Sequence, residues 1–176
     1  TKWKFSKPKK SNILIYDNES IEELEFFLKD KRYEIFHTRY EQLNIFIILY
    51  TIFINGIKNL KKNYKLNYFK FVSPKVVITL IDENPGFFKL KNLYPSAKYI
   101  SVQIAFKDEQ FYRYIKDFKK NNNKFQFGSD VSFVLGNNDK NKYKRYLKSK
   151  LISLGSIRNN NFPIKKNYNK KINKIL

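Results

Sequence analysis

Short apolar runs that stop at polar residues alternate along this chain with segments whose apolar residues recur at helical spacing. The runs are rich in Val and Ile, which is typical of parallel strands that are buried on both faces. We predict six such strands, at residues 12–16, 33–37, 75–81, 98–103, 131–135 and 151–154.

The segments between these runs predict helices. Residues 18–32 place Ile21, Leu24, Phe27 and Leu28 at helical spacing, with Asn18 or a neighbour as the cap. Residues 43–56 are apolar nearly all round, which predicts a buried helix, and residues 57–71 continue it or start another. Further helices are predicted after Pro85, within residues 105–128 on a face of Phe111, Tyr112, Ile115 and Phe118, and at residues 138–148, with residues 121–123 as a loop.

Strands that alternate with helices predict an α/β fold: a Rossmann-like three-layer domain with a mostly parallel sheet of about six strands. The first strand is followed by Asp17-Asn18-Glu19-Ser20, so a Gly-x-Gly-x-x-Gly dinucleotide fingerprint is missing, and we predict no nucleotide cofactor. We divide the chain into a basic N-terminal arm (1–11), the Rossmann-like domain (12–158) and a basic linker (159–176) toward a missing second domain.

Charge narrows the classes of partner. The 176 residues carry 36 Lys and Arg against 15 Asp and Glu, a net charge of +21, which favours an anionic membrane surface or nucleic acid. AT-rich codon usage is an alternative source of the many lysines. Most aromatic residues fall in apolar runs that we assign to the core, so nucleic acid is the less favoured partner.

Three acid-free segments, at residues 1–10, 57–71 and 158–176, hold 5, 5 and 6 of the basic residues and predict weak binding to anionic lipid. The longest apolar stretch, residues 43–54, is shorter than the ~20 residues that span a bilayer. No signal peptide is visible, so we expect a cytoplasmic protein that is peripheral at the inner face of the membrane.

Candidate chemistry lies where the predicted strands end, because ligands of open α/β sheets bind beyond the carboxyl ends of the strands. Asp82 and Glu83 are the candidate catalytic residues, as a general base for a sugar hydroxyl or as a grip on hydroxyls. The alternative is that this turn only starts a helix. The candidate substrate-binding residues are Asp17, Asn18, Asn84, Gln103, Ser156, Arg158 and Asn159.

We expect Asp82 to face an open cleft near Asp17, Gln103 and Ser156. The alternatives are a structural role for Gln103 and an ordinary surface turn at Ser156. His37 is the sole histidine and the chain has no cysteine, so no metal site is predicted and a structural role is favoured for His37.

Five motifs follow one another along the chain: Asn12-Ile-Leu-Ile-Tyr-Asp-Asn18, Val77-Ile-Thr-Leu-Ile-Asp-Glu-Asn-Pro85, Ile100-Ser-Val-Gln103, Phe133-Val-Leu-Gly136 and Leu154-Gly-Ser-Ile-Arg-Asn-Asn160. Together they resemble the family called surface carbohydrate biosynthesis proteins, which are transferases with a two-domain GT-B-like layout. The resemblance covers roughly residues 12–161. It departs from the family pattern at Ile104-Ala105, where Asn-Gly or a similar pair is expected.

The resemblance implies the N-terminal, acceptor-side domain of a glycosyltransferase that builds bacterial lipopolysaccharide or capsule. The partners that the resemblance implies are a sugar acceptor, either free or linked to a lipid, and a nucleotide-sugar donor that the missing C-terminal domain holds. The 176 residues alone are then expected to be inactive. The alternatives are a non-catalytic accessory or scaffold domain and a basic nucleic-acid-binding protein.

Overall fold

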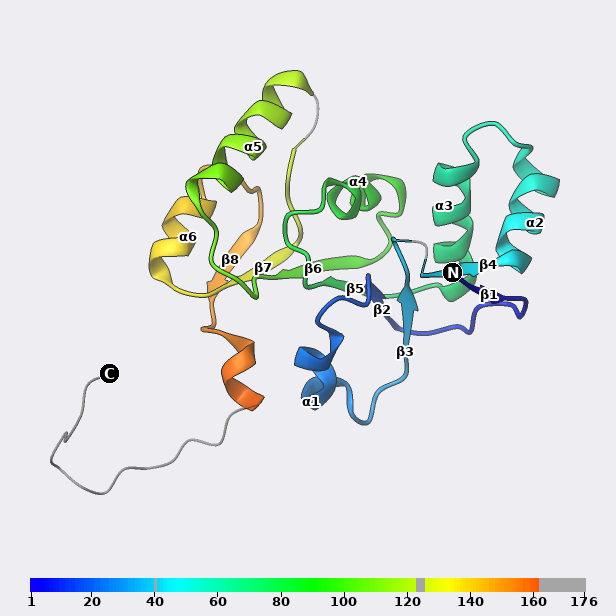
Figure 1. Cartoon of the computed structure of the whole chain (residues 1–176), viewed down its shortest axis with the longest axis horizontal. Helices are drawn as coiled ribbons and strands as arrows, with labels where there is room; N and C mark the ends of the chain where they lie inside the picture. The colour runs from blue at the N-terminus through cyan, green and yellow to red at the C-terminus, as the bar shows by residue number, and fades with distance from the viewer. Residues whose placement is uncertain (40, 123–125, 162–176) are drawn as a thin grey trace, which may run out of the picture.

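The six apolar runs form one all-parallel sheet, which crosses the centre of the domain (Figure 1). The computed structural model describes residues 1–39, 41–122 and 126–161. The strands of the sheet are β2 (Ile13–Tyr16), β3 (Tyr33–Phe36), β5 (Val76–Thr79), β6 (Lys98–Val102), β7 (Val131–Val134) and β8 (Lys150–Ser153). The predicted Rossmann-like α/β class is therefore confirmed. Five of the strands are one to three residues shorter than predicted, and β8 keeps the predicted length but begins one residue earlier.

The spatial order of the strands is β3-β2-β5-β6-β7-β8. The chain moves outward from β2 to β3, then returns past β2 to β5 and continues outward to β8 on the other side. The order therefore reverses between β2 and β5. In open parallel sheets, such a reversal opens a crevice at the carboxyl edge, where ligands bind.

The helices are divided unequally between the two faces of the sheet (Figure 1). One face carries α3 (Leu60–Val72), α4 (Pro85–Leu93), α5 (Glu109–Asn121) and α6 (Asn137–Tyr143), which pack on the larger hydrophobic core. The other face carries the short η1 (Ile21–Leu24), α1 (Glu25–Leu28) and η2 (Ile157–Asn161) over a smaller cluster. The sheet is therefore covered on both faces, but far more thickly on one.

Aromatic rings make up much of the larger core. Phe87 is fully buried on α4, and its ring centroid lies 5.6 Å from that of Tyr16 on β2 and 5.6 Å from that of Tyr99 on β6. These separations are within the range in which tilted and edge-to-face aromatic pairs attract. The assignment of most aromatics to the core holds for rings such as Phe87 and Tyr99, whereas others, such as Phe26, Phe53 and Phe106, are exposed.

Local capping explains where two helices of this layer begin. Asn84 accepts a hydrogen bond from the Gly86 amide (2.8 Å), and Pro85 stands in the first turn of α4, as predicted. Asp108 caps α5 through the amide of Phe111 (3.0 Å). The buried face of α5 includes Phe111, Tyr112 and Ile115, which confirms the predicted helical face.

The basic N-terminal arm (1–11) contains a short strand. β1 (Lys2–Lys4) pairs in parallel with β4 (Gln42–Asn44) in a separate two-stranded sheet, in which Trp3 lies opposite Leu43. The pairing joins segments about forty residues apart and each strand has three residues, so neither strand has a periodic signal of its own.

The prediction of one buried helix at residues 43–56 is wrong in two respects. β4 occupies the start of this range, and α2 (Ile45–Asn55) begins after Asn44, whose side chain accepts a hydrogen bond from the Ile47 amide (3.0 Å). The helix is also largely exposed, and Phe53 keeps 87% of its surface. Gly56, with a left-handed φ of 67°, ends α2, so α3 is a separate helix.

Three smaller predictions are also corrected. Of Asn18 and its neighbours, Ser20 occupies the cap position before η1, but it makes no side-chain capping hydrogen bond. Asn121 belongs to α5 rather than to a loop, and the rest of that predicted loop lies partly outside the described residues. The predicted boundary at 158/159 falls inside η2, and residues 162–176 of the predicted linker lie outside the described part.

Candidate functional site

The candidate residues predicted from the sequence all follow strands of the parallel sheet, so they lie at its carboxyl edge. They do not converge on one site. The side chains separate into a group around Asp82, a group around Asp17 and a group around Arg158, and each group has its own partners. The expectation of one shared cleft is therefore wrong.

Asp82 lies beneath the surface of the carboxyl edge, with 3% of its area exposed. Its Oδ2 accepts a hydrogen bond from the Tyr143 hydroxyl on α6 (2.5 Å), and its Oδ1 lies 3.0 Å from the Lys107 ammonium. The prediction that Asp82 faces an open cleft is wrong, because the carboxylate is buried against Tyr143 of α6 and Lys107 of the loop before α5. The predicted position of Asp82 shortly after β5, at the carboxyl edge, is correct.

Burial decides the protonation chemistry of this group. Loss of solvation raises the pKa of Asp82 above its ordinary value, and Lys107 and Tyr143 offset only part of the rise. Burial would lower the pKa of Lys107, but Asp82 and Glu83 together outweigh it and raise that pKa. Burial and the neighbouring Asp82 also raise the pKa of Tyr143, so its hydroxyl keeps the proton that it donates.

Glu83 is the carboxylate that reaches solvent. Its side chain is 49% exposed, and its Oε2 lies 2.8 Å from the same Lys107 ammonium that contacts Asp82. It borders a cavity of about 590 Å³, which is also lined by Ile81, Asn84, Pro85, Asp108, Gln110, Phe111 and Tyr114. The buried Asp82 thus holds Lys107, and Lys107 holds Glu83 at the rim of this cavity.

The cavity combines groups that bind hydroxyls with an aromatic ring. Asn84 and Asp108 use one side-chain oxygen each to cap α4 and α5, so the N-termini of both helices border the cavity. Gln110 is exposed, and Tyr114 is 46% exposed on α5. The arrangement suits a neutral, hydroxyl-rich ligand that accepts and donates hydrogen bonds at a rim and lies against a ring.

Gln103 is part of the interior rather than of this rim. Its side chain accepts a hydrogen bond from the Leu135 amide (3.1 Å) and donates to the Ala105 carbonyl (3.0 Å) and to Asp139 (3.3 Å). Only 1% of its surface is exposed. These contacts join the ends of β6 and β7 to α6. Gln103 therefore has the structural role that was the alternative to substrate binding.

Asp17 forms a second group at the ends of β2 and β3. Its Oδ1 accepts a hydrogen bond from the Glu19 amide (3.1 Å), and its Oδ2 accepts one from the Thr38 hydroxyl. Arg39 pairs with Glu19 and approaches Asp17 (3.7 Å). The positive φ of Asp17 (81°) turns the chain out of β2, and its side chain stabilises that turn. Asn18 is half-buried beside it.

The third group lies toward the thinly covered face of the sheet. Arg158 on η2 pairs with Glu23 on η1 (3.0 Å) and approaches the Ser20 hydroxyl (3.5 Å). Ser156 is half-buried, and its carbonyl accepts a hydrogen bond from the Asn159 amide (3.2 Å). The guanidinium therefore ties η2 to η1, and the candidate substrate-binding residues Ser156, Arg158 and Asn159 do not line the Glu83 cavity.

His37, for which a structural role was favoured, follows β3 and lines an apolar cavity of about 270 Å³ with Leu43, Ile48 and Tyr64. Burial lowers the pKa of His37, which favours the neutral imidazole. Within residues 1–39, 41–122 and 126–161, no three His, Asp or Glu side chains cluster closely enough to hold a metal ion.

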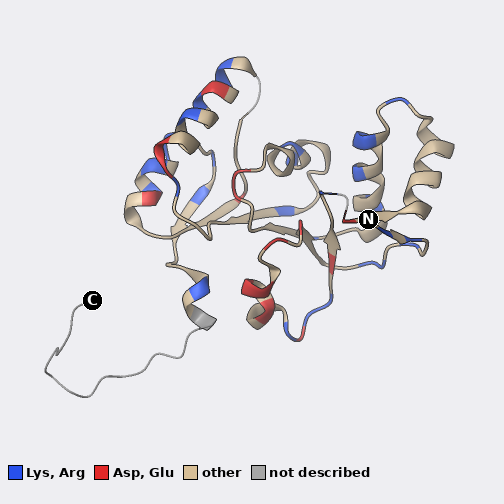
Figure 2. Ribbon diagram, in the orientation of Figure 1, with Lys and Arg blue, Asp and Glu red and all other residues tan. Residues whose placement is uncertain are grey.

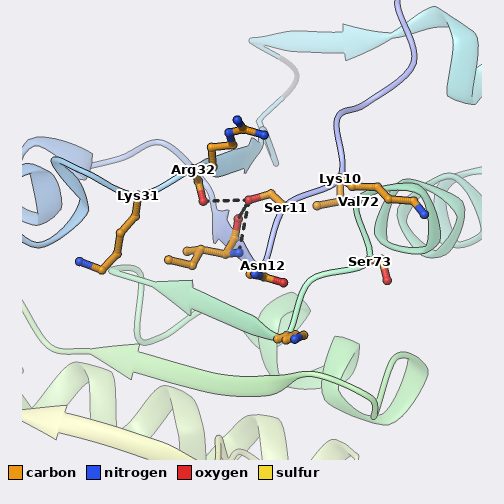
Figure 3. A pocket seen from close by; sticks show the side chains of 9 residues that line it. Lys10, Ser11, Asn12, Lys31, Arg32, Val72 and Ser73 are labelled. Carbon is orange, nitrogen blue, oxygen red and sulfur yellow. Dashed lines mark hydrogen bonds between the residues drawn. The ribbon is translucent and has the colours of Figure 1, made fainter.

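A basic pocket of about 610 Å³ lies at the opposite, amino edge of the sheet (Figure 3). Lys10, Lys31, Arg32 and Lys75 border it. Its central hydroxyl, that of Ser11, is occupied by backbone groups, because it donates to the Arg32 carbonyl (2.9 Å) and accepts from the Ile13 amide (3.3 Å). We therefore assign Ser11 a structural role, in which its hydroxyl connects the starts of β2 and β3.

The sequence interpretation missed Lys107, Asp108, Gln110, Tyr114 and Tyr143. One signal was available for three of them. Asp108 stands three residues before Phe111, the first residue of the predicted helical face, as an N-cap should. Capping at Asp108 would have placed Gln110 and Tyr114 on α5. Lys107 and Tyr143 contact Asp82 only through the tertiary fold.

These features define the chain as a doubly wound, Rossmann-like α/β domain with a polar cavity at the carboxyl edge. No protein-family profile matches the chain, and no curated protein or solved structure is significantly similar to it.

Proposed function

We propose that this chain is the acceptor-side, N-terminal domain of a glycosyltransferase that makes bacterial surface carbohydrate, such as lipopolysaccharide or capsule. The observation that carries the proposal is the cavity at the carboxyl edge, where the exposed Glu83 is held in place by Lys107. Carboxylates and amides hydrogen-bond to sugar hydroxyls, and a ring such as Tyr114 packs against the apolar side of a sugar.

In this proposal the acceptor hydroxyl attacks the anomeric carbon of the donor sugar. The new bond forms from the acceptor oxygen to that carbon, the bond from the carbon to the donor phosphate breaks, and the nucleoside diphosphate leaves with the electron pair. Glu83 accepts the hydroxyl proton. Asp82 and Lys107 are positioning residues, because they touch Glu83 or its partner rather than the acceptor.

The nucleotide-sugar donor belongs, in this proposal, to a second domain. No glycine-rich phosphate loop follows β2, and Asp17 stands there instead. We place the protein on the cytoplasmic side and at the inner face of the membrane, where a lipid-linked acceptor is presented. None of the helices in the described residues has both the length and the apolar character to cross a bilayer.

We predict that the purified 176 residues transfer no sugar. The proposed reaction takes place between two domains, and the Glu83 cavity supplies only the acceptor half. Turnover is measured as release of nucleoside diphosphate from a panel of nucleotide-sugars in the presence of acceptor. Release above the rate of spontaneous hydrolysis would contradict the division of labour between two domains.

We predict that Glu83→Gln weakens binding of a soluble oligosaccharide acceptor by about tenfold, since a hydrogen bond to a charged group contributes about 1.5–3 kcal/mol. Isothermal titration calorimetry gives the dissociation constants. Glu109→Gln is the matched control, because Glu109 is a neighbouring glutamate with 76% of its side chain exposed and does not line the cavity. Equal effects of the two changes would contradict a specific role for Glu83.

A further inference from the structure

α2 presents an apolar surface to solvent that no described residue covers. The large apolar side chains that are exposed on α2 and the turn after it are Leu49 (62%), Tyr50 (38%), Ile52 (40%), Phe53 (87%), Ile54 (55%) and Ile57 (77%). A helix that is apolar all round belongs in a protein core or against lipid. Contiguous apolar surfaces of this kind on soluble domains mark interaction sites.

The other side of α2 is already occupied. Ile47 and Thr51 are buried, and Asn67 of α3 donates hydrogen bonds to Thr51 (3.0 Å) and Asn55 (2.9 Å). The ring of Phe71 lies 4.9 Å from that of Tyr50. The α2–α3 hairpin therefore holds its exposed face in a fixed orientation, away from α3.

Basic residues dominate the chain around this surface, and Glu41, just before β4, is the nearest acidic residue in sequence. Residues 42–81 contain no Asp or Glu, and residues 1–16 contain none either. Lys58, Lys61 and Lys62 follow the apolar surface directly, and Lys2 and Lys4 lie on β1, which pairs with the strand that leads into α2. Figure 2 shows basic residues on α3 and on the turn that joins it to α2, and no acidic residue on either helix.

We infer that the exposed face of α2 docks into the interfacial region of an anionic lipid bilayer. The apolar side chains enter the boundary between headgroups and acyl chains, and the flanking lysines contact anionic headgroups. An anionic bilayer explains both the apolar face and the lack of acidic residues in residues 1–16 and 42–81. A protein partner would explain the apolar face alone. The inference rests on the membrane-side part of the proposed function and specifies the surface that carries it.

The surface lies close to the carboxyl edge of the sheet. Ile48 of α2 and Leu60 of α3 line the same cavity as His37 and Thr38, which follow β3. Docking through α2 therefore places the end of β3, and the nearby point where the strand order reverses between β2 and β5, near the membrane. An acceptor carried by a lipid would reach this edge without leaving the bilayer surface.

Vesicle flotation tests the inference with vesicles that contain no glycolipid, so that lipid binding is measured apart from acceptor binding. The chain is expected to float with phosphatidylcholine vesicles that contain phosphatidylglycerol and not with phosphatidylcholine alone, and binding should weaken as salt rises. Leu49→Gln/Phe53→Gln is expected to lower the partition coefficient by about tenfold or more.

Phe26→Gln/Leu154→Gln is the matched control. It changes the same residue types at similarly exposed positions (78% and 55%) on α1 and after β8, and it should float like the wild type. Equal losses in both double variants, equal binding to neutral vesicles or stronger binding to RNA at physiological salt would overturn the inference. So would a dimer, seen by sedimentation, that Leu49→Gln/Phe53→Gln dissociates. The Glu83 titration in solution involves no lipid, so its failure would count against the acceptor site alone.

Discussion

Lys107→Met is expected to lower the free energy of unfolding by about 3–5 kcal/mol at pH 7, because it leaves a buried carboxylate without its counter-charge. In the folded chain the Lys107 ammonium lies 3.0 Å from Asp82, which is 3% exposed, and only the Tyr143 hydroxyl would remain beside that carboxylate. Urea unfolding followed by circular dichroism gives the value.

Lys142→Met is the control, since Lys142 lies 3.9 Å from the exposed Glu109 and such surface pairs contribute at most about 1 kcal/mol. A loss for Lys107→Met no larger than that of the control would mean that Asp82 does not need Lys107.

The loss should shrink in acid. Burial already raises the folded-state pKa of Asp82, and removal of Lys107 raises it further, so the variant takes up its proton at a higher pH than the wild type. As pH falls through these two pKa values, the folded variant gains protons that the wild type has not yet bound. Linkage therefore stabilises the variant relative to the wild type, and the difference at pH 4 should be smaller than at pH 7. A difference that grows toward pH 4 would contradict a raised pKa.

Phe87→Ala is expected to cost about 3–5 kcal/mol, as is usual when a buried aromatic ring is removed and a cavity remains. Phe87 is fully buried on α4 between Tyr16 and Tyr99, which belong to two different strands of the sheet. Thermal unfolding should give a clear fall in Tm relative to the wild type.

Phe26→Ala removes the same ring from a site that is 78% exposed, and it should change stability by less than about 0.5 kcal/mol. Similar Tm values for the two variants would show that the rings around Phe87 do not form the core.

The layered fold could be predicted because its signals are local. Val76–Thr79 and its neighbours in the sheet are short Val- and Ile-rich runs, and α4 begins at Asn84-Pro85 with Phe87 and Phe88 buried behind it. The buried face of α5 also follows from spacing alone. Each of these elements is specified within about a dozen residues, which is the range over which periodicity and capping act.

The pairing of β1 with β4 and the exposure of α2 could not be predicted in the same way. An apolar helix is usually buried, and only the tertiary fold shows that α3 covers one side of α2 and leaves Leu49 and Phe53 in solvent. The expectation of burial failed where the sequence has its longest apolar stretch.

The candidate site was predicted in part. The sequence located Asp82, Glu83 and Asn84 at the end of a strand, and the fold separates them by burial into a positioning residue, a rim carboxylate and a helix cap. Tyr143 lies 61 residues from Asp82 in the chain, and Lys107 lies 24 residues from Glu83. Contacts at such distances depend on strand order, which no local pattern encodes.

The most direct test of the proposed acceptor site is a nuclear magnetic resonance titration of the ¹⁵N-labelled chain with a soluble surface-carbohydrate oligosaccharide. The proposal predicts saturable shift changes that centre on Glu83, Asn84 and Tyr114, around the cavity at the carboxyl edge. An absence of saturable changes, or changes that centre on Ser11 and Arg32 at the amino edge, would contradict it.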